Sequence, residues 1–235
     1  MTIESDTVTE TSRAVKETAV ATGKVVDLAD RFGTFVAKFV AGPLEQSVGI
    51  FEDQLRFARF KRQLRLMEKV NELMADVCGN KQIKPLELKL AIPLFQAASL
   101  EDDDDLQDIW ARLLVNSSVA SHGIELRRAY IDILVQLTQM DANILDKIYA
   151  IPHDTHQNLH VLTGGLPDTV SVRDVGSSEQ NGLVQPSPEV TISLANLSRL
   201  GCIGLPTAWD GGEIFTSVYH TVMGRSLIHA CRLDN

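Results

Sequence analysis

The sequence predicts a mostly α-helical protein: a multi-helix domain around one long helix, followed by a small C-terminal α/β module that is winged-helix-like. The first observation behind this fold class is an apolar pattern of helical spacing that runs from Gly42 to Gly79. Further helical patterns continue to about residue 150. The last part of the chain is predicted to form a helix, a hairpin and a helix, in that order. The expected organisation is a flexible tail at 1–12, a helical domain at 13–150, a loop or linker at 151–188 and the winged-helix-like module at 189–235.

Composition limits the class of protein. The chain has 235 residues, 44% hydrophobic content and a net charge of −9. This composition suits a folded domain, and the acidity argues against nucleic-acid binding as a dedicated role. The start, MTIESDTVTETS, lacks a secretion signal, and no apolar run reaches the roughly 18–20 residues of a membrane span. Cys78, Cys202 and Cys231 are far apart and predict no disulfide framework. We expect a soluble protein with reduced cysteines that is cytoplasmic or at most peripheral at the inner membrane.

The first predicted helix, from about Arg13 to Val40, carries an apolar stripe that includes Phe32, Phe35 and Phe39. Such a stripe can pack inside the protein or lie in a bilayer interface with its phenylalanines inserted. The charges on the opposite face nearly cancel, and Gly33 weakens the helix. These features favour packing against the long helix over peripheral contact with an anionic inner membrane.

The long helix is predicted between two end signals, Pro43 at its first turn and Gly79 after its last. Its apolar positions step by three and four residues from Leu44 to Val77, with Arg62 as the interruption. As one helix it would be roughly 50 Å long. Because short helices cover such a length poorly, we expect self-association or a partner protein along this helix.

A basic stripe crosses the middle of the long helix. It consists of Arg56, Arg59, Lys61, Arg62, Arg65 and Lys69, with Glu68 as the one acid among them. On an acidic chain these bases need an acidic counterpart, either the internal run Glu101–Asp105 or an external partner such as anionic lipid. Long basic side chains often lie over apolar surface within their own protein, which favours the internal pairing. We keep Arg56, Arg59, Arg62, Arg65 and Lys69, with the three phenylalanines above, as interaction candidates.

Four further segments complete the helical domain. A helix is expected from Pro85, with a kink or restart at Pro93, although Leu86, Leu88 and Leu90 also alternate as in a strand. Ser99 and Asp102 resemble a capping box that places the acidic run in the first turn of the next helix. The apolar segment Ile124–Leu137 is expected to be central, and Asp141–Tyr149 is expected to form a short helix.

The linker contains His153, His156 and His160, which are spaced closely enough to suggest a metal site. No carboxylate or thiol pattern completes such a site, so we expect neither a metal nor another cofactor. After the linker, Ser187 and Pro188 start a helix, Trp209–Glu213 marks a turn, and Val222–Leu233 forms the last helix. A winged-helix-like order of elements raises the alternative of a transcriptional regulator. The helix that would contact DNA, which starts at Pro188, has Arg199 as its one base, and this is little positive charge for a DNA-binding protein.

No phosphate-binding glycine loop, nucleophile elbow, zinc-binding His-Glu helix or paired-carboxylate motif is present, so no catalytic residues are assigned. The nearest catalytic pattern is Arg225 with His229 on the last helix. All-helical toxin ribonucleases also use an arginine and a histidine, but with a wider separation. A ribonuclease is therefore an alternative, and a protein without enzymatic activity is favoured.

Four stretches of the chain carry a family resemblance. They are GPLEQSVGIFEDQLRFARFKR, IPLFQAASLEDDDDLQDIWARLLVNSS, RRAYIDILVQLTQMDANILDKI and the T-x-x-G-x-x-L-I-x-A-C ending at Cys231. From about Ala41 to Cys231 the chain resembles the abortive infection alpha family, Abi-alpha, most specifically in the blocks Ala98–Asp102 and Trp110–Leu114. The resemblance implies a role in anti-phage defence and no particular reaction, so we expect action by binding or as a non-enzymatic effector.

Overall fold

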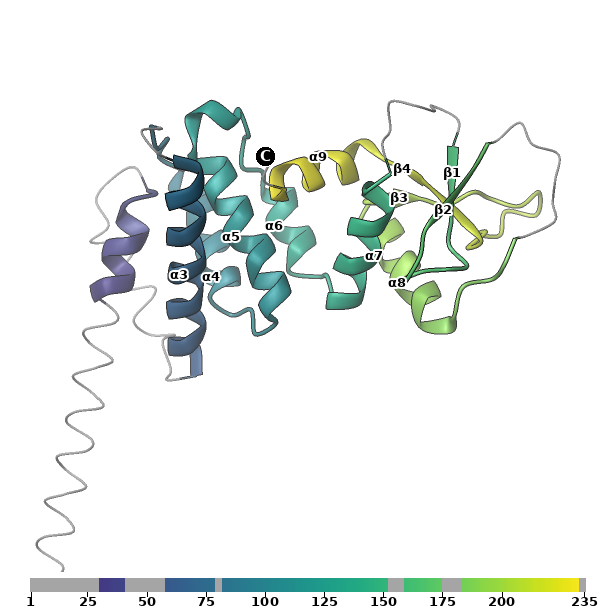
Figure 1. Cartoon of the computed structure of the whole chain (residues 1–235), viewed down its shortest axis with the longest axis horizontal. Helices are drawn as coiled ribbons and strands as arrows, with labels where there is room; N and C mark the ends of the chain where they lie inside the picture. The colour runs from purple at the N-terminus through teal and green to yellow at the C-terminus, as the bar shows by residue number, and fades with distance from the viewer. Residues whose placement is uncertain (1–29, 41–57, 79–81, 152–158, 175–182, 233–235) are drawn as a thin grey trace, which may run out of the picture.

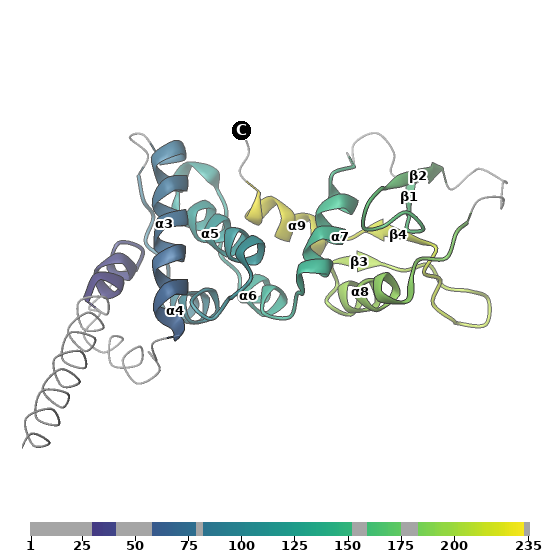
Figure 2. The same cartoon turned by 60° about the horizontal axis from the view of Figure 1, so that its bottom comes forward.

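A computed structural model describes residues 30–40, 58–78, 82–151, 159–174 and 183–232. Within this part the protein is mostly helical and contains one small antiparallel sheet of four strands, which confirms the predicted class at this level. Figures 1 and 2 show an elongated molecule with α3 to α6 at one end and the sheet with α8 at the other. Helices α7 and α9 lie between the two ends (Figure 1).

The helical end contains α3 (Ala58–Cys78), α4 (Leu88–Ala98), α5 (Asp104–Ser118), the short 3-10 helix η1 (Ala120–His122) and α6 (Arg128–Leu134). Helix α3 packs along α5. It corresponds to the second half of the predicted long helix, and the first half, at residues 41–57, lies outside the described residues. The described helix of 21 residues is about 30 Å long. Its neighbour α5 buries Trp110, which forms part of a continuous core.

Residues 30–37 are helical and carry the predicted phenylalanine stripe into this core. Phe32, Phe35 and Phe39 are each 2% exposed. All three rings lie around Phe95 of α4, with centroid distances of 6.2, 6.0 and 6.3 Å. The backbone adds one bond, from the Leu86 amide to the Phe39 carbonyl at 2.8 Å. The stripe therefore packs inside the protein, as its balanced charges indicate, and the segment lies beside α3 in both views.

The start of α5 differs from the prediction. Asp103 caps the helix, since its carboxylate accepts a hydrogen bond from the Leu106 amide at 2.9 Å. The predicted capping box of Ser99 and Asp102 is wrong, because Ser99 ends α4 and donates to the Gln96 carbonyl at 3.0 Å. Asp103, three residues before buried Leu106, is therefore the capping residue of α5 in place of Ser99. The acidic run still begins the helix, where the helix dipole favours negative charge.

Two other helix boundaries are corrected. Helix α4 begins at Leu88 and continues through Pro93, whereas the residues after Pro85 are extended and Leu86 forms a parallel bridge with Val40. The segment 124–137 is helical as α6 between Arg128 and Leu134. The next helix, α7 (Gln139–Tyr149), begins with a capping box of Thr138 and Asp141, which matches the predicted helix closely.

The sheet contains β1 (Leu159–Leu162), β2 (Ser171–Asp174), β3 (Ile203–Gly204) and β4 (Ser217–His220) in the order β2-β1-β4-β3. The interpretation of 151–188 as a loop is therefore wrong for β1 and β2. Val161 of β1 pairs with Val218 of β4, and both are buried. Helix α8 (Pro188–Arg199) begins as predicted, with the Ser187 hydroxyl accepting from the Val190 amide at 3.3 Å.

Helix α9 (Val222–Cys231) follows β4 directly and returns to the helical end, where it packs on α5 and α7 (Figures 1 and 2). Buried Asn116 of α5 holds its C-terminus by donating to the carbonyls of Ala230 at 3.0 Å and Arg232 at 2.6 Å. The C-terminal segment is thus joined to the helical end through a buried contact. This return path brings α5, α7 and α9 together around the middle of the molecule.

Candidate functional site

The basic stripe of α3 faces the acidic run at the start of α5. Arg62 pairs with Asp102 at 3.1 Å, Arg65 with Asp104 at 3.3 Å, and Lys69 with both Asp104, at 3.2 Å, and Asp108. The internal pairing expected from the sequence is therefore present for these three bases. Arg56 lies outside the described residues, and the side chain of Arg59 also lies outside them.

Gln107 connects these charges to the buried backbone. It is fully buried, accepts from the Arg65 guanidinium and donates to the Arg62 carbonyl at 2.9 Å. Burial opposes the charge on Lys69, but the hydrogen bonds and charges of Asp108 and Asp104 outweigh it and raise the pKa of Lys69 above its ordinary 10.5. The lysine is charged at neutral pH, and its contribution to stability is lost only as the pH rises through that raised pKa.

Removing two bases of this network should lower stability. We expect Arg65→Gln with Lys69→Gln to reduce the free energy of unfolding by about 1–2 kcal/mol, since partly exposed ion pairs contribute about 0.2–1 kcal/mol each and Arg65 also bonds buried Gln107. The matched control is Lys89→Gln with Arg128→Gln, which removes the same charge from two exposed pairs. Urea denaturation measures both. Equal losses would contradict a special role for the network.

The remaining interaction candidates lie in the core. Phe32, Phe35 and Phe39 cannot reach a bilayer in this arrangement without leaving Phe95. None of the described helices is both long and apolar enough to cross a membrane.

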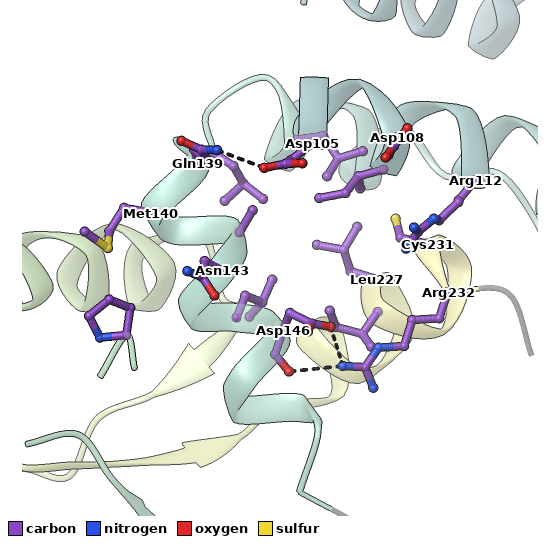
Figure 3. Close-up of a pocket in the computed structure, with 17 residues that line it drawn as sticks. Asp105, Asp108, Arg112, Gln139, Met140, Asn143, Asp146, Leu227, Cys231 and Arg232 are labelled. Carbon is purple, nitrogen blue, oxygen red and sulfur yellow. Dashed lines mark hydrogen bonds and ion pairs between the residues drawn. The ribbon is translucent and has the colours of Figure 1, made fainter. Parts of the chain in front are cut away.

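A cleft of about 640 Å³ lies where α5, α7 and α9 meet, and we call it the waist cleft (Figure 3). Its apolar lining includes Ile109, Leu134, Leu137, Leu145, Leu227 and Ile228, and its polar lining includes Asp105, Asp108, Arg112, Gln139, Asn143, Asp146 and Arg232. Figure 3 shows Asp105 and Asp108 on one rim, Asp146 with Arg232 on the opposite rim, and Leu227 between them. The cleft thus has an apolar floor between two polar rims.

Most charges on the rims have partners. Arg232 pairs with Asp146 at 2.6 Å, and the Gln139 amide donates to Asp105 at 2.8 Å. Half-buried Arg112 makes no hydrogen bond or ion pair with any described residue. A guanidinium in this position suits a carboxylate or phosphate on a ligand whose apolar part occupies the floor.

Cys231 lies beside Arg112 in the cleft (Figure 3). Burial raises the pKa of the Cys231 thiol to about 12, although the nearby Arg112 charge lowers it. Burial likewise raises the pKa of Cys202 to about 11. Both thiols are protonated at neutral pH, so neither has the thiolate character of a reactive cysteine.

Sequence reasoning did not assign the waist cleft. Its strongest signal was Arg112, a charged residue inside the apolar run of α5 that belongs to the block carrying the family resemblance. Asp146 and Arg232 are separated by 86 positions in the chain, and no spacing rule brings them together.

Arg225 and His229, the alternative catalytic candidates, both lie on α9. His229 is exposed on α9 and lines a second cavity with Arg127 and Tyr130, whereas Arg225 does not line that cavity. The ribonuclease alternative stays a prediction.

The linker histidines are partly described. His160 lies on β1, where its ring nitrogen is 3.3 Å from the Ser217 hydroxyl and its ring is 6.2 Å from that of Tyr219. His153 and His156 lie outside the described residues. Among the described residues no group of three or more metal-ligating side chains is gathered.

Comparison with known protein families gives a match over most of the chain. A family model described as abortive infection alpha matches residues 54–231, which is more than half of the chain. No curated protein matches the chain, and no solved structure matches it.

Proposed function

The chain belongs to the abortive infection alpha family, and on this premise we propose that it acts in anti-phage defence by binding a ligand or partner. The observation that carries the binding part is the waist cleft. Its volume lies in the range of about 300–1,000 Å³ that is usual for small-molecule sites. Its apolar floor and the side chain of Arg112 together fit a ligand with an apolar body and an anionic group.

The position of the cleft supports an effector role. Helix α9 connects the sheet to the helical end and lines the cleft with Leu227 and Ile228. A ligand that contacts α5, α7 and α9 at once would favour one arrangement of the two ends over others. Binding in the cleft is thus a route by which infection can change the protein without a covalent reaction.

The test is a plaque assay in a phage-sensitive host that expresses the full chain. We expect wild-type protein to lower the number of plaques and Asn143→Trp to restore it, because Asn143 is exposed at the cleft and indole would fill part of it. Ala195→Trp is the matched control, since Ala195 is an exposed residue of α8 that does not line the cleft. Circular dichroism of both purified variants checks their fold.

Two results would overturn the proposal at different levels. Unchanged plaque number and burst size with wild-type protein, across a broad phage panel, would remove the defence role. Full protection by folded Asn143→Trp would show that the waist cleft is not needed for defence, while the defence role itself would stand.

Other predicted roles and partners remain proposals with their own measurements. Self-association along α3 is measured by light scattering of the purified chain, and contact with an anionic membrane by flotation with vesicles. A winged-helix regulator would expose bases on α8, where Arg199 instead donates to Gln136 at 3.0 Å and to Asn196 at 2.7 Å. Binding through the waist cleft has the stronger support.

A further inference from the structure

A second cavity, of about 400 Å³, lies between the chain segments that precede α4 and α6, with α9 on its far side. Lys84, Arg127 and His229 line it, and Glu125 is the one acidic side chain in its lining. The cavity lining comes from three separate stretches of sequence, at Lys84, at 119–130 and at 226–230. On a chain of net charge −9, a cavity with this balance of basic side chains is a local exception.

Lys84 and Arg127 differ from six other bases of the described residues, which form ion pairs. Arg62, Arg65, Lys69, Lys89, Arg128 and Arg232 all pair with a carboxylate. The side chains of Lys84 and Arg127 form neither an ion pair nor a hydrogen bond with a described residue. Two cations that face one cavity and form no ion pair with a described carboxylate leave their charge available to an anion, although the charge of Lys84 also acts on Glu87.

We infer that this cavity binds the phosphate group of a small phosphorylated ligand of about nucleotide size. Arg127 supplies the planar guanidinium that suits two phosphate oxygens, and Lys84 supplies a second positive charge. Tyr130 and Ser226 line the same cavity and bring hydroxyl groups. Val119 and Ile124 provide an apolar wall for the rest of the ligand. The volume of about 400 Å³ falls within the range for small-molecule sites.

The test measures binding to the full chain by titration calorimetry, with inorganic phosphate, adenosine 5′-monophosphate and adenosine as probes at equal ionic strength. We expect the monophosphate to bind more tightly than phosphate, and adenosine not to bind. Lys84→Gln and Arg127→Gln should each weaken binding of the monophosphate by about tenfold or more, as expected for loss of a charge-assisted contact.

Arg128→Gln is the matched control. It removes the same charge one position away, but Arg128 pairs with Asp132 at 2.8 Å and does not line the cavity. Lys84, Arg127 and Arg128 are all exposed, so these variants should keep the fold, which circular dichroism checks.

Three outcomes would overturn the inference: no binding of either phosphate probe at concentrations on the order of 10 mM, equal weakening by Arg127→Gln and Arg128→Gln, or adenosine binding as tightly as its monophosphate. Inorganic phosphate binding as tightly as the monophosphate would support the phosphate site and overturn the nucleotide-sized body. The site is separate from the waist cleft, so this experiment and the plaque assay can fail independently.

Discussion

Phe95→Ala is expected to lower the free energy of unfolding by about 3–5 kcal/mol. Phe95 is fully buried, and its ring is shared by Phe32, Phe35 and Phe39 from residues 30–40. Truncation removes one aromatic ring and leaves three others facing a cavity, which a short helical segment cannot close without moving. Because Phe95 is the ring that all three phenylalanines contact, the segment should detach before the rest of the core unfolds.

Two measurements separate these effects. Urea denaturation gives the loss in global stability, and limited trypsin digestion at Arg31 and Lys38 reports release of the segment. The matched control is Val135→Ala, which shortens a residue that is 61% exposed and should change stability by less than about 0.5 kcal/mol. A Phe95→Ala protein with native stability and unchanged protease resistance would show that the aromatic cluster does not anchor the segment.

Local patterns in the sequence predicted those parts of the fold that depend on local physics. The phenylalanine stripe at 32–39 has helical spacing and packs as a unit. The start of α8 at Ser187 and Pro188 is predicted correctly, because an N-terminal cap depends on the next three residues alone. The pairing of the α3 stripe with the acidic run follows from charge balance on an acidic chain.

The sheet and the waist cleft depend on contacts between distant residues. Strands β1 and β2 have four residues each, too few for a clear alternating pattern, and β1 acquires its central position by pairing with β4. The cleft needs α9 to return to α5, which no pattern within α9 encodes. Asn116, which fixes that return, reads in the sequence as an ordinary polar residue of α5.

The junction of β4 and α9 depends on a glycine. The Tyr149 hydroxyl donates to the Cys202 carbonyl at 2.7 Å and accepts from the Thr221 amide at 3.0 Å. Gly224 lies against this pair, and a Cβ atom there would overlap both the Cys202 carbonyl oxygen and the Tyr149 hydroxyl. Tyr149 is further held by stacking on His220, at a centroid distance of 4.4 Å.

Gly224→Ala is therefore expected to lower the free energy of unfolding by about 3 kcal/mol or more, because the overlap involves backbone and a buried ring with little freedom to move. The matched control is Gly33→Ala, the same change in the helical residues 30–37, where an added Cβ meets no atom within 4 Å. That control should gain up to about 1 kcal/mol, since alanine has the higher helix propensity. Urea denaturation of the two variants should give changes of opposite sign. A neutral Gly224→Ala would mean that α9 can shift away from Tyr149, and the waist cleft that α9 lines would then have to be a deformable site.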